Sequence, residues 1–208
     1  MEENTQALID TRLSVTKVII ILNIAVFLFM MITGDPSNAE YMADHGAVWA
    51  PYIVDNGEYY RLFTAVFEHF DVSHIFNNLL LLFFLGDILE RTLGRVMYTI
   101  VYVLSGIAGN VLSVYMELLT ADYSVSAGAS GAIFGVVGGV LFEVIYHRGH
   151  FRGISTGRMV FFVLLSLYVG VASSGVNNSA HAGGLVCGFL LTAVFQLLID
   201  AKKRNNAI

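Results

Sequence analysis

The sequence predicts an all-α integral membrane protein built as a bundle of six transmembrane helices. Of the 208 residues, 56% are hydrophobic and only 13% are charged, whereas a soluble domain carries about 25% charged residues. Glycine is frequent, with 20 residues, and proline is rare, with 2. Glycine without proline is typical of closely packed membrane helices, so lipid is the expected solvent.

Six apolar stretches account for the predicted helices. A spanning helix needs roughly 17–25 mainly apolar residues, and several stretches lie at the short end of that range. None shows the alternating pattern of a membrane barrel, which leaves helices as the spanning structure. The first stretch has no clear small-residue cleavage site after it, so we expect a retained helix and not a removed signal peptide. The stretches are Val18–Thr33, Val72–Leu89, Val96–Met116, Ser130–Tyr146, Met159–Ala172 and Ala180–Ile199.

Positive charges fall on one side of the predicted bundle. Of the 11 Lys and Arg residues, only Arg61 lies in the long connection 34–71 between the first two helices. The others lie in the two tails, at the start of the first helix, and in the second-to-third and fourth-to-fifth connections. Because Lys and Arg concentrate on the cytoplasmic side of membrane proteins, we expect both termini in the cytoplasm.

Three polar side chains stand at the starts of predicted helices. His74, Ser130 and His181 begin the second, fourth and sixth apolar stretches. With the orientation above, these three helices all run from the outside inward, so the three residues share an outward-facing depth. Polar residues in membrane segments are costly and mark functional sites by default.

Small residues predict that the fourth and sixth helices pack closely. Such faces let two membrane helices approach, which would bring Ser130 and His181 within hydrogen-bond reach. A serine hydroxyl becomes a nucleophile when a base such as histidine takes its proton. A single glycine-flanked serine, however, is usually only a packing residue. The small residues that recur every fourth position are Gly131, Gly135 and Gly139, followed on the sixth helix by Ala180, Gly184 and Gly188.

A second group of hydrogen-bond donors lies on the second helix. His74 and Asn78 are four residues apart and share one helix face. Acyl transfer needs donors directed at a developing oxyanion, and the backbone N–H of Ser130 at a helix start is a further donor. Spacing alone leaves open the alternative that His74 and Asn78 only tie helices together.

These motifs together resemble the rhomboid family of intramembrane serine proteases. The matching segments are Gly128-Ala129-Ser130-Gly131 and Ala180-His181-Ala182-Gly183-Gly184, with His69, His74 and Asn78 resembling the family's histidine–asparagine cluster and Glu90 its acidic position after the second helix. The resemblance covers about Gly57 to Leu198, which is essentially the six-helix core.

The resemblance implies a role for each matching residue. Ser130 would attack the scissile carbonyl, and His181 would act first as general base and then as general acid, without an aspartate. His74, Asn78 and the Ser130 N–H would stabilise the oxyanion, and the backbone of Gly128 would approach the substrate chain. His69 would be a supporting residue that organises either the loop or the mouth of the cavity.

Two positions depart from the family pattern. Tyr60-Arg61 stands where the family often has Trp-Arg, and tyrosine can still anchor the loop at the membrane interface. Phe134 stands where the family often has tyrosine, one turn after Ser130. Its ring can still stack on His181 as a supporting contact, although the hydroxyl is absent.

The expected protein is therefore a serine endopeptidase that cleaves transmembrane segments of single-span proteins near the extracytoplasmic face, through an acyl-enzyme. We divide it into a cytoplasmic tail (1–17), a six-helix rhomboid-like catalytic domain (18–199) and a second cytoplasmic tail (200–208). The expected location is the plasma membrane, with lipid and transmembrane substrates as partners. We expect no nucleic-acid partner, no cofactor and no metal, because no zinc or calcium ligand spacing is present.

Two other classes of function compete with this interpretation. A transporter or channel would place its polar residues near the middle of the helices and often shows an internal repeat. Here the polar residues lie at helix ends and no repeat is visible. An inactive relative would bind membrane-protein clients without cutting them, but Ser130 and His181 are both present.

Overall fold

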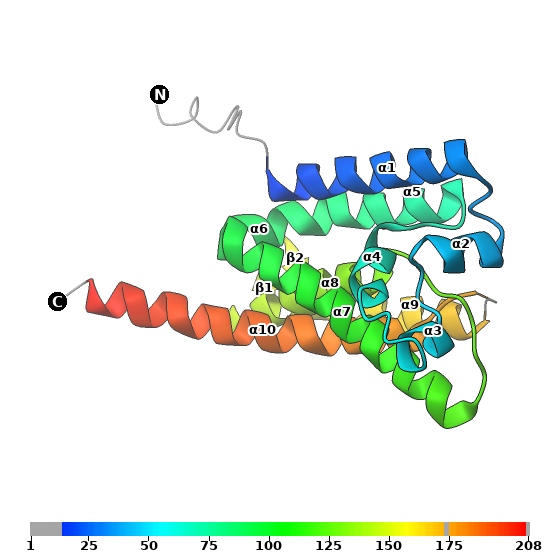
Figure 1. The fold of residues 1–208 in the computed structure, drawn as a ribbon. Helices are drawn as coiled ribbons and strands as arrows, with labels where there is room; N and C mark the ends of the chain where they lie inside the picture. Colours follow the sequence, from blue (N-terminus) through cyan, green and yellow to red (C-terminus); the bar gives the residue numbers. More distant parts are fainter. Residues whose placement is uncertain (1–13, 173–174, 207–208) are drawn as a thin grey trace.

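The computed structural model describes residues 14–172 and 175–206, and most of these residues are helical (Figure 1). The all-α fold class is confirmed. Four helical segments are long and apolar enough to cross a membrane, and two apolar helices are shorter, so the count of six spans stays a prediction. The long segments are Val15–Thr33, Val72–Leu93, Arg95–Thr120 and Asn178–Asn205, and the shorter ones are Ser130–Tyr146 and Thr156–Tyr168.

Each predicted apolar stretch corresponds to a helix of the structure. Most of the helices extend beyond the apolar stretches because polar residues cap their ends, as Ser14 and Asn177 do at the starts of α1 and α10. Between the first two long segments lie short helices that the hydropathy pattern did not predict. The helical elements are α1 (Val15–Thr33), α2 (Ala39–His45), α3 (Ala50–Val54), α4 (Arg61–Thr64), η1 (Ala65–Phe67), α5 (Val72–Leu81), η2 (Leu82–Gly86), α6 (Asp87–Leu93), α7 (Arg95–Thr120), α8 (Ser130–Tyr146), α9 (Thr156–Ala172) and α10 (Asn178–Asn205).

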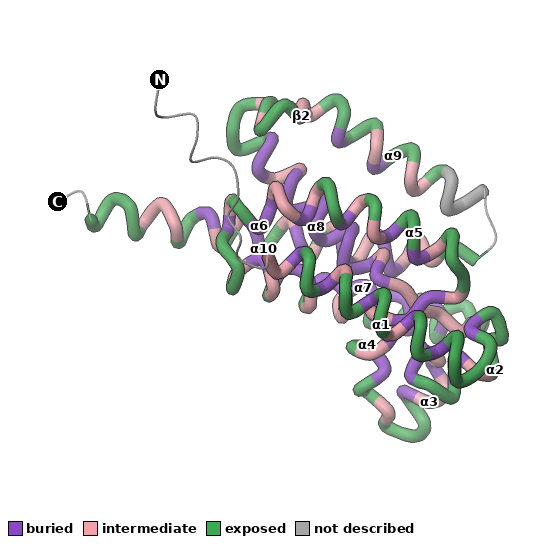
Figure 2. The backbone as a smooth tube through the Cα atoms, turned by 90° about the horizontal axis from the view of Figure 1, so that it is seen from above, coloured by how far each residue is buried: buried purple, intermediate pink, exposed green. Residues whose placement is uncertain are grey.

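Helix α8 forms the centre of the bundle, and most of its residues are buried (Figure 2). It packs against α7 and α10, and its contact with α10 is made backbone to backbone. A Cβ atom added at Gly184 would overlap the carbonyl oxygen of Gly131, and one at Gly188 would overlap that of Gly135. The two predicted small-residue faces therefore meet, and the starts of α8 and α10 lie at the same end of the bundle.

The N-terminus of α1 is held by a carboxylate from α6. Glu90 is buried and accepts hydrogen bonds from the N–H groups of Val15 and Thr16, at 2.8 and 2.9 Å, and from the Thr16 hydroxyl at 2.8 Å. A carboxylate at a helix N-terminus satisfies free N–H groups and is favoured by the helix dipole. Glu90 thus joins α1 to the end of the second helical segment.

The connection 34–71 is an ordered cap over one end of the bundle. Arg61 is buried there, donates to the carbonyl oxygens of Ala43 and Ala47, and pairs with Glu58 at 2.6 Å. An arginine with several donors can satisfy carbonyl groups that no helix pairs. This explains the one Lys or Arg residue in an otherwise acidic segment.

Helix α9 lies at the edge of the bundle, apart from α1 and α7 (Figure 2). Phe161, Leu164 and Tyr168 are 67%, 62% and 71% exposed, and these side chains suit a lipid-facing helix. A short antiparallel pair, β1 (His150–Phe151) and β2 (Ile154–Ser155), joins α8 to α9. The hydropathy pattern gave no sign of it.

Candidate active site

Three helix starts meet at the capped end of the bundle. Ser130 is the first residue of α8, His181 the fourth of α10 and His74 the third of α5. Ser130 and His74 are half-buried, and His181 is 8% exposed. This grouping follows from the helix order that the sequence predicted.

The loop before Ser130 is fixed by three contacts to the cap. Val48 and Ser126 exchange two backbone hydrogen bonds, and the N–H of Gly128 donates to the carbonyl of Ala65 at 2.8 Å. The N–H of Ala129 donates to Nε2 of His69 at 3.4 Å. Ser130 therefore stands at the start of α8 on a loop that has little freedom to move.

The ring of His181 lies flat on Phe134. The two ring centroids are 4.1 Å apart and the planes are inclined by 7°. Phe134 follows Ser130 by one helical turn, so this stacking holds the imidazole beside the turn that carries Ser130. Nδ1 of His181 has no hydrogen-bond partner among the described residues. Within residues 14–172 and 175–206, the contact that orients this ring is therefore the stacking on Phe134 and not a hydrogen bond to a carboxylate.

Ser130 and His181 are brought close but are not hydrogen-bonded. In the described part of the chain no hydrogen bond joins the two side chains. The backbones are in contact nevertheless, because a Cβ added at Gly131 would lie 3.5 Å from the carbonyl oxygen of Ala180. In enzymes without bound substrate, hydrogen bonds between catalytic side chains are often long and shorten when substrate binds.

Gly128 lies against the two donors of α5. A Cβ at this position would be 2.8 Å from Nε2 of His74 and 3.8 Å from Nδ2 of Asn78, and its φ of +137° also disfavours any other residue. Asn78 is 5% exposed and its Nδ2 has no partner in the described structure. A buried donor left without an acceptor is uncommon and marks a place where a ligand can supply one.

His69 supports both the loop and His74. It is fully buried, its ring meets that of His74 edge-on with centroids 5.0 Å apart, and it accepts the Ala129 N–H described above. Burial, with a smaller effect from the neighbouring His74, lowers the pKa of His69 to about 3. A neutral imidazole keeps one acceptor nitrogen, so the contact to Ala129 persists over the physiological pH range.

Glu68, next to His69, is buried without a partner for its Oε2 atom. Burial raises the pKa of Glu68 to about 8, although the nearby Arg61 acts in the opposite direction. The raised pKa means that the neutral acid stabilises the folded protein. This contribution is complete below the unfolded value of about 4.5 and is lost as the pH rises through 8.

Replacing Glu68 by glutamine should therefore make the protein less sensitive to alkaline pH. At about pH 9 we expect Glu68→Gln to unfold at a higher temperature than the wild type, with a free energy of unfolding that is larger by a few kcal/mol. Near pH 5 the two proteins should unfold at the same temperature. Thermal unfolding in detergent across this range measures the difference. Asp44→Asn, which neutralises an exposed carboxylate of the same cap, is the control. An equal gain in both variants would contradict the assignment to Glu68.

Asn177 is a site residue that the sequence analysis missed. Its Oδ1 accepts the N–H of Ala180, and its Nδ2 donates to the hydroxyls of Ser113 and, at 3.0 Å, Ser126. It therefore ties the start of α10, which carries His181, to α7 and to the loop before Ser130. An asparagine just before an apolar helix is a known capping signal, and that signal could have identified it.

The described residues hold no group of three or more His, Cys, Asp or Glu side chains that could bind a metal ion. The chemistry available at the site is that of the hydroxyl, the imidazole and the donors described above. Each sequence-predicted site residue lies within this one region. The set is Ser130, His181, His74, Asn78, Gly128, His69 and Phe134.

The chain also resembles known proteins in sequence. The sequence model of the Rhomboid domain matches residues 56–197. The chain is 32% identical to rhomboid protease GluP of Bacillus subtilis (strain 168) over 182 residues, covering 88% of this chain and 35% of that protein. It is 35% identical to RHOMBOID-like protein 1 of Arabidopsis thaliana over 156 residues, covering 73% of this chain and 38% of the relative.

A third relative comes from a distant organism. Rhomboid-like protease 1 of Toxoplasma gondii is 31% identical over 168 residues, which are 79% of this chain and 56% of the relative. The chain thus spans about a third to a little over half of the length of these three proteins. The Rhomboid domain match covers well over half of the chain and includes every proposed site residue. The chain belongs to the rhomboid family.

Proposed function

We propose that this protein is an intramembrane serine endopeptidase that cuts transmembrane segments with a Ser130–His181 dyad. The observation that carries the proposal is the flat stacking of His181 on Phe134, one turn after Ser130. It holds a general base next to a hydroxyl at a helix start. Membership of a family that includes proteins named as proteases supports the same activity.

Acylation uses both side chains. Ser130 Oγ attacks the scissile carbonyl carbon while His181 takes the hydroxyl proton, which gives a tetrahedral oxyanion and an imidazolium. When the intermediate collapses, the C–N bond breaks and His181 returns the proton to the leaving amine. The product is an ester between Ser130 and the acyl half of the substrate.

Deacylation repeats these steps with water as the nucleophile. His181 takes a proton from the water, the hydroxide attacks the ester, and the collapse of the second tetrahedral intermediate returns the proton to Ser130 Oγ. The carboxylic acid leaves and the enzyme is regenerated. Water would reach the site from the extracytoplasmic side, since the inferred orientation puts these helix starts at the outer ends and not at the middle of the bilayer.

The oxyanion is stabilised by donors that surround Gly128. Asn78 Nδ2 and Nε2 of His74 lie beside Gly128, and Ser130 begins α8 two residues later, where its N–H and the helix dipole add positive potential. Because Asn78 Nδ2 has no other partner in the described structure, it gives up no hydrogen bond when it donates to the oxyanion. The substrate backbone would lie along Gly128, which carries no side chain of its own and lies beside His74 and Asn78.

The charge distribution supports an orientation in the membrane, and the rhomboid family supports a class of substrate. We infer that the chain lies in the plasma membrane with both termini in the cytoplasm, so that the site opens to the extracytoplasmic face. Substrates would be single-span proteins cut near their outer end. A substrate helix must unwind before its carbonyl reaches Ser130, and Gly or Pro near the cut reduces the free energy of unwinding.

A fluorophosphonate probe tests the nucleophile directly. The purified wild type in detergent should become covalently labelled, Ser130→Ala should not, and Ser179→Ala should be labelled as the wild type is. Ser179 is a half-buried serine two residues before His181, so it controls for general serine reactivity. A folded wild type without label, or a labelled Ser130→Ala, would refute the dyad.

Replacing Asn78 by alanine tests the oxyanion donor. We expect kcat to fall by about 10²–10³-fold with little change in KM, because the donor acts on charge that develops in the transition state. Cleavage of a tagged single-span substrate in proteoliposomes measures both constants. Asn77→Ala, which changes the exposed neighbouring amide of α5, should retain activity. A change confined to KM in Asn78→Ala would assign the residue to substrate binding instead.

A second candidate function is the binding of membrane-protein clients without cleavage. The lack of a hydrogen bond between Ser130 and His181 in the described structure favours it. The probe experiment separates the two functions, because a binding protein has no activated serine to label.

A further inference from the structure

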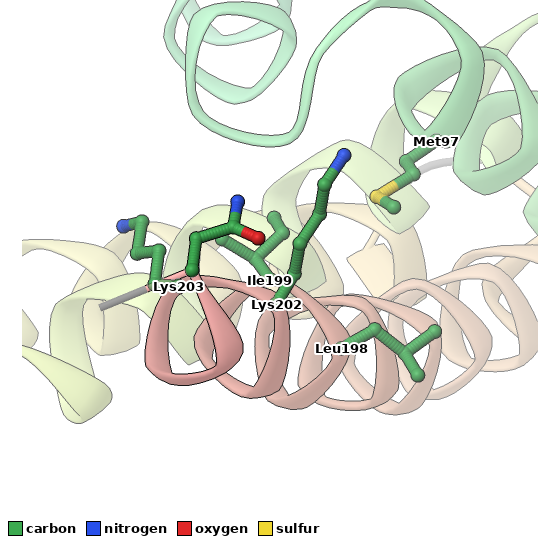
Figure 3. A pocket seen from close by; sticks show the side chains of 6 residues that line it. Met97, Leu198, Ile199, Lys202 and Lys203 are labelled. Carbon is green, nitrogen blue, oxygen red and sulfur yellow. The ribbon is translucent and has the colours of Figure 1, made fainter. Parts of the chain in front are cut away.

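We propose that an anionic glycerophospholipid binds in a pocket between the start of α7 and the end of α10, at the end of the bundle opposite the candidate active site. The pocket has a volume of about 420 Å³ and is lined by Met97, Leu198, Ile199, Lys202, Lys203 and Asn206. Figure 3 shows the lysine and apolar side chains around it. Its lining combines apolar walls with two cationic side chains.

The cationic half suits a phosphate headgroup. Lys202 and Lys203 are exposed, and in residues 14–172 and 175–206 neither forms an ion pair. The nearest acid in sequence, Asp200, is engaged by the Tyr146 hydroxyl at 2.5 Å and by Gln196. Among the described residues these two positive charges therefore have no counter-ion, and a lipid phosphate can supply one.

The N-terminus of α7 adds to the positive potential. Gly94 caps this 26-residue helix without a side chain, so the free N–H groups of the first turn have no side-chain acceptor at the cap. Met97 belongs to that turn and lines the pocket. The partial positive charge of the helix end therefore reinforces the two lysines.

The apolar half suits an acyl chain. Four exposed residues of α10 are spaced four apart and form a stripe along one face of the helix. The last of them, Leu198, is also a wall of the pocket. A lipid with its phosphate at the lysines can lay a chain along this stripe, which a free phosphate ion or a soluble anion cannot do. The stripe consists of Val186, Leu190, Val194 and Leu198, which are 57%, 57%, 52% and 55% exposed.

The position of the pocket agrees with this ligand. Helix α10 continues past the other long helices at this end (Figure 1). Its apolar sequence gives way to Lys202, Lys203 and Arg204 in the last turns, as expected where a helix leaves the hydrocarbon for the headgroup layer. The site depends on membrane insertion and not on the proposed proteolysis, so the two proposals can fail separately.

Quenching of tryptophan fluorescence by brominated lipid tests the proposal. Val194→Trp places a fluorescent reporter one turn from the pocket, and the protein without this substitution corrects for the fluorescence of the native Trp49. Val194→Trp with both lysines intact is the parent reporter protein. In phosphatidylcholine vesicles we compare brominated phosphatidylglycerol with brominated phosphatidylcholine as the quencher. We expect a preference for phosphatidylglycerol that falls about tenfold or more in Lys202→Gln/Lys203→Gln, since each lysine near an anionic lipid contributes measurably to binding.

Two control pairs make the result decisive. Lys202→Arg/Lys203→Arg keeps the charge and should keep the preference. Arg148→Gln/Arg152→Gln removes the same charge from the loop between α8 and α9, away from the pocket, and should leave the preference unchanged. Equal quenching by the two brominated lipids in the parent reporter protein would overturn the proposal. So would an equal loss in the Arg148/Arg152 pair, because it would show a diffuse charge effect.

Discussion

Replacing Ser130 or His181 by alanine should abolish cleavage of a transmembrane substrate, with a loss of at least about 10³-fold in kcat/KM. Ser130→Ala removes the only atom that forms the acyl-enzyme, and His181→Ala removes the base that activates it. The double variant should be no worse than either single variant, because the two side chains act as one unit. Gel analysis of fragments from a tagged single-span protein measures the loss.

The matched controls remove the same two kinds of side chain at positions outside the proposed dyad. Ser179→Ala and His150→Ala remove a hydroxyl and an exposed imidazole that take no part in the proposed site, and both should cleave as the wild type does. Each variant must also retain the wild-type unfolding temperature, since His181 packs on Phe134. Fragments that persist at the same positions in His181→Ala would show that another protease makes them.

The helical core of this protein could be predicted from sequence because lipid imposes simple rules. Each long apolar stretch had to become a helix, and the glycine spacing on α8 and α10 predicted the close contact between Gly131 and Gly184. The order of the helices then placed Ser130, His181 and His74 at one end. These inferences needed only local patterns and the direction of each helix.

The remaining features depend on contacts between distant parts of the chain. The cap over the site is built on Arg61 and its carbonyl partners 14 and 18 residues away, and short helices such as α2 are too short to give a hydropathy signal. The carboxylate of Glu90 binds the start of α1, 74 residues earlier. The side chain of Asn177 donates hydrogen bonds to the hydroxyls of Ser113 and Ser126, which lie 64 and 51 residues earlier. No local pattern predicts which partner such a side chain selects.

The π-helical turn η2 is a further feature that periodicity could not predict. It occupies Leu82–Gly86 within the second long segment and so separates the donors on α5 from Glu90 on α6. A π turn inserts one residue into the helical repeat and rotates everything beyond it. The apolar positions before and after the π turn are therefore offset by one residue, so the sequence of the whole segment does not show one continuous apolar face.

Replacing Gly188 by alanine should strongly destabilise the protein, although the change adds only one methyl group. The added Cβ would overlap the carbonyl oxygen of Gly135 and lie 2.5 Å from its Cα. These are backbone atoms in the most buried helix, so neither can move aside as a flexible side chain would. We expect a loss of about 3 kcal/mol or more, at the upper end of overpacking effects and despite the better helix propensity of alanine.

The loss should extend to activity, because the same contact sets the distance between Ser130 and His181. Unfolding in detergent measures the stability, and fluorophosphonate labelling of the folded fraction measures the site. Gly157→Ala is the control: this glycine is also helical, but its added Cβ meets no atom within 4 Å, so stability should be unchanged or slightly higher. If Gly188→Ala unfolded and reacted like Gly157→Ala, α8 and α10 would not be in backbone contact, and the geometry on which the dyad depends would be lost.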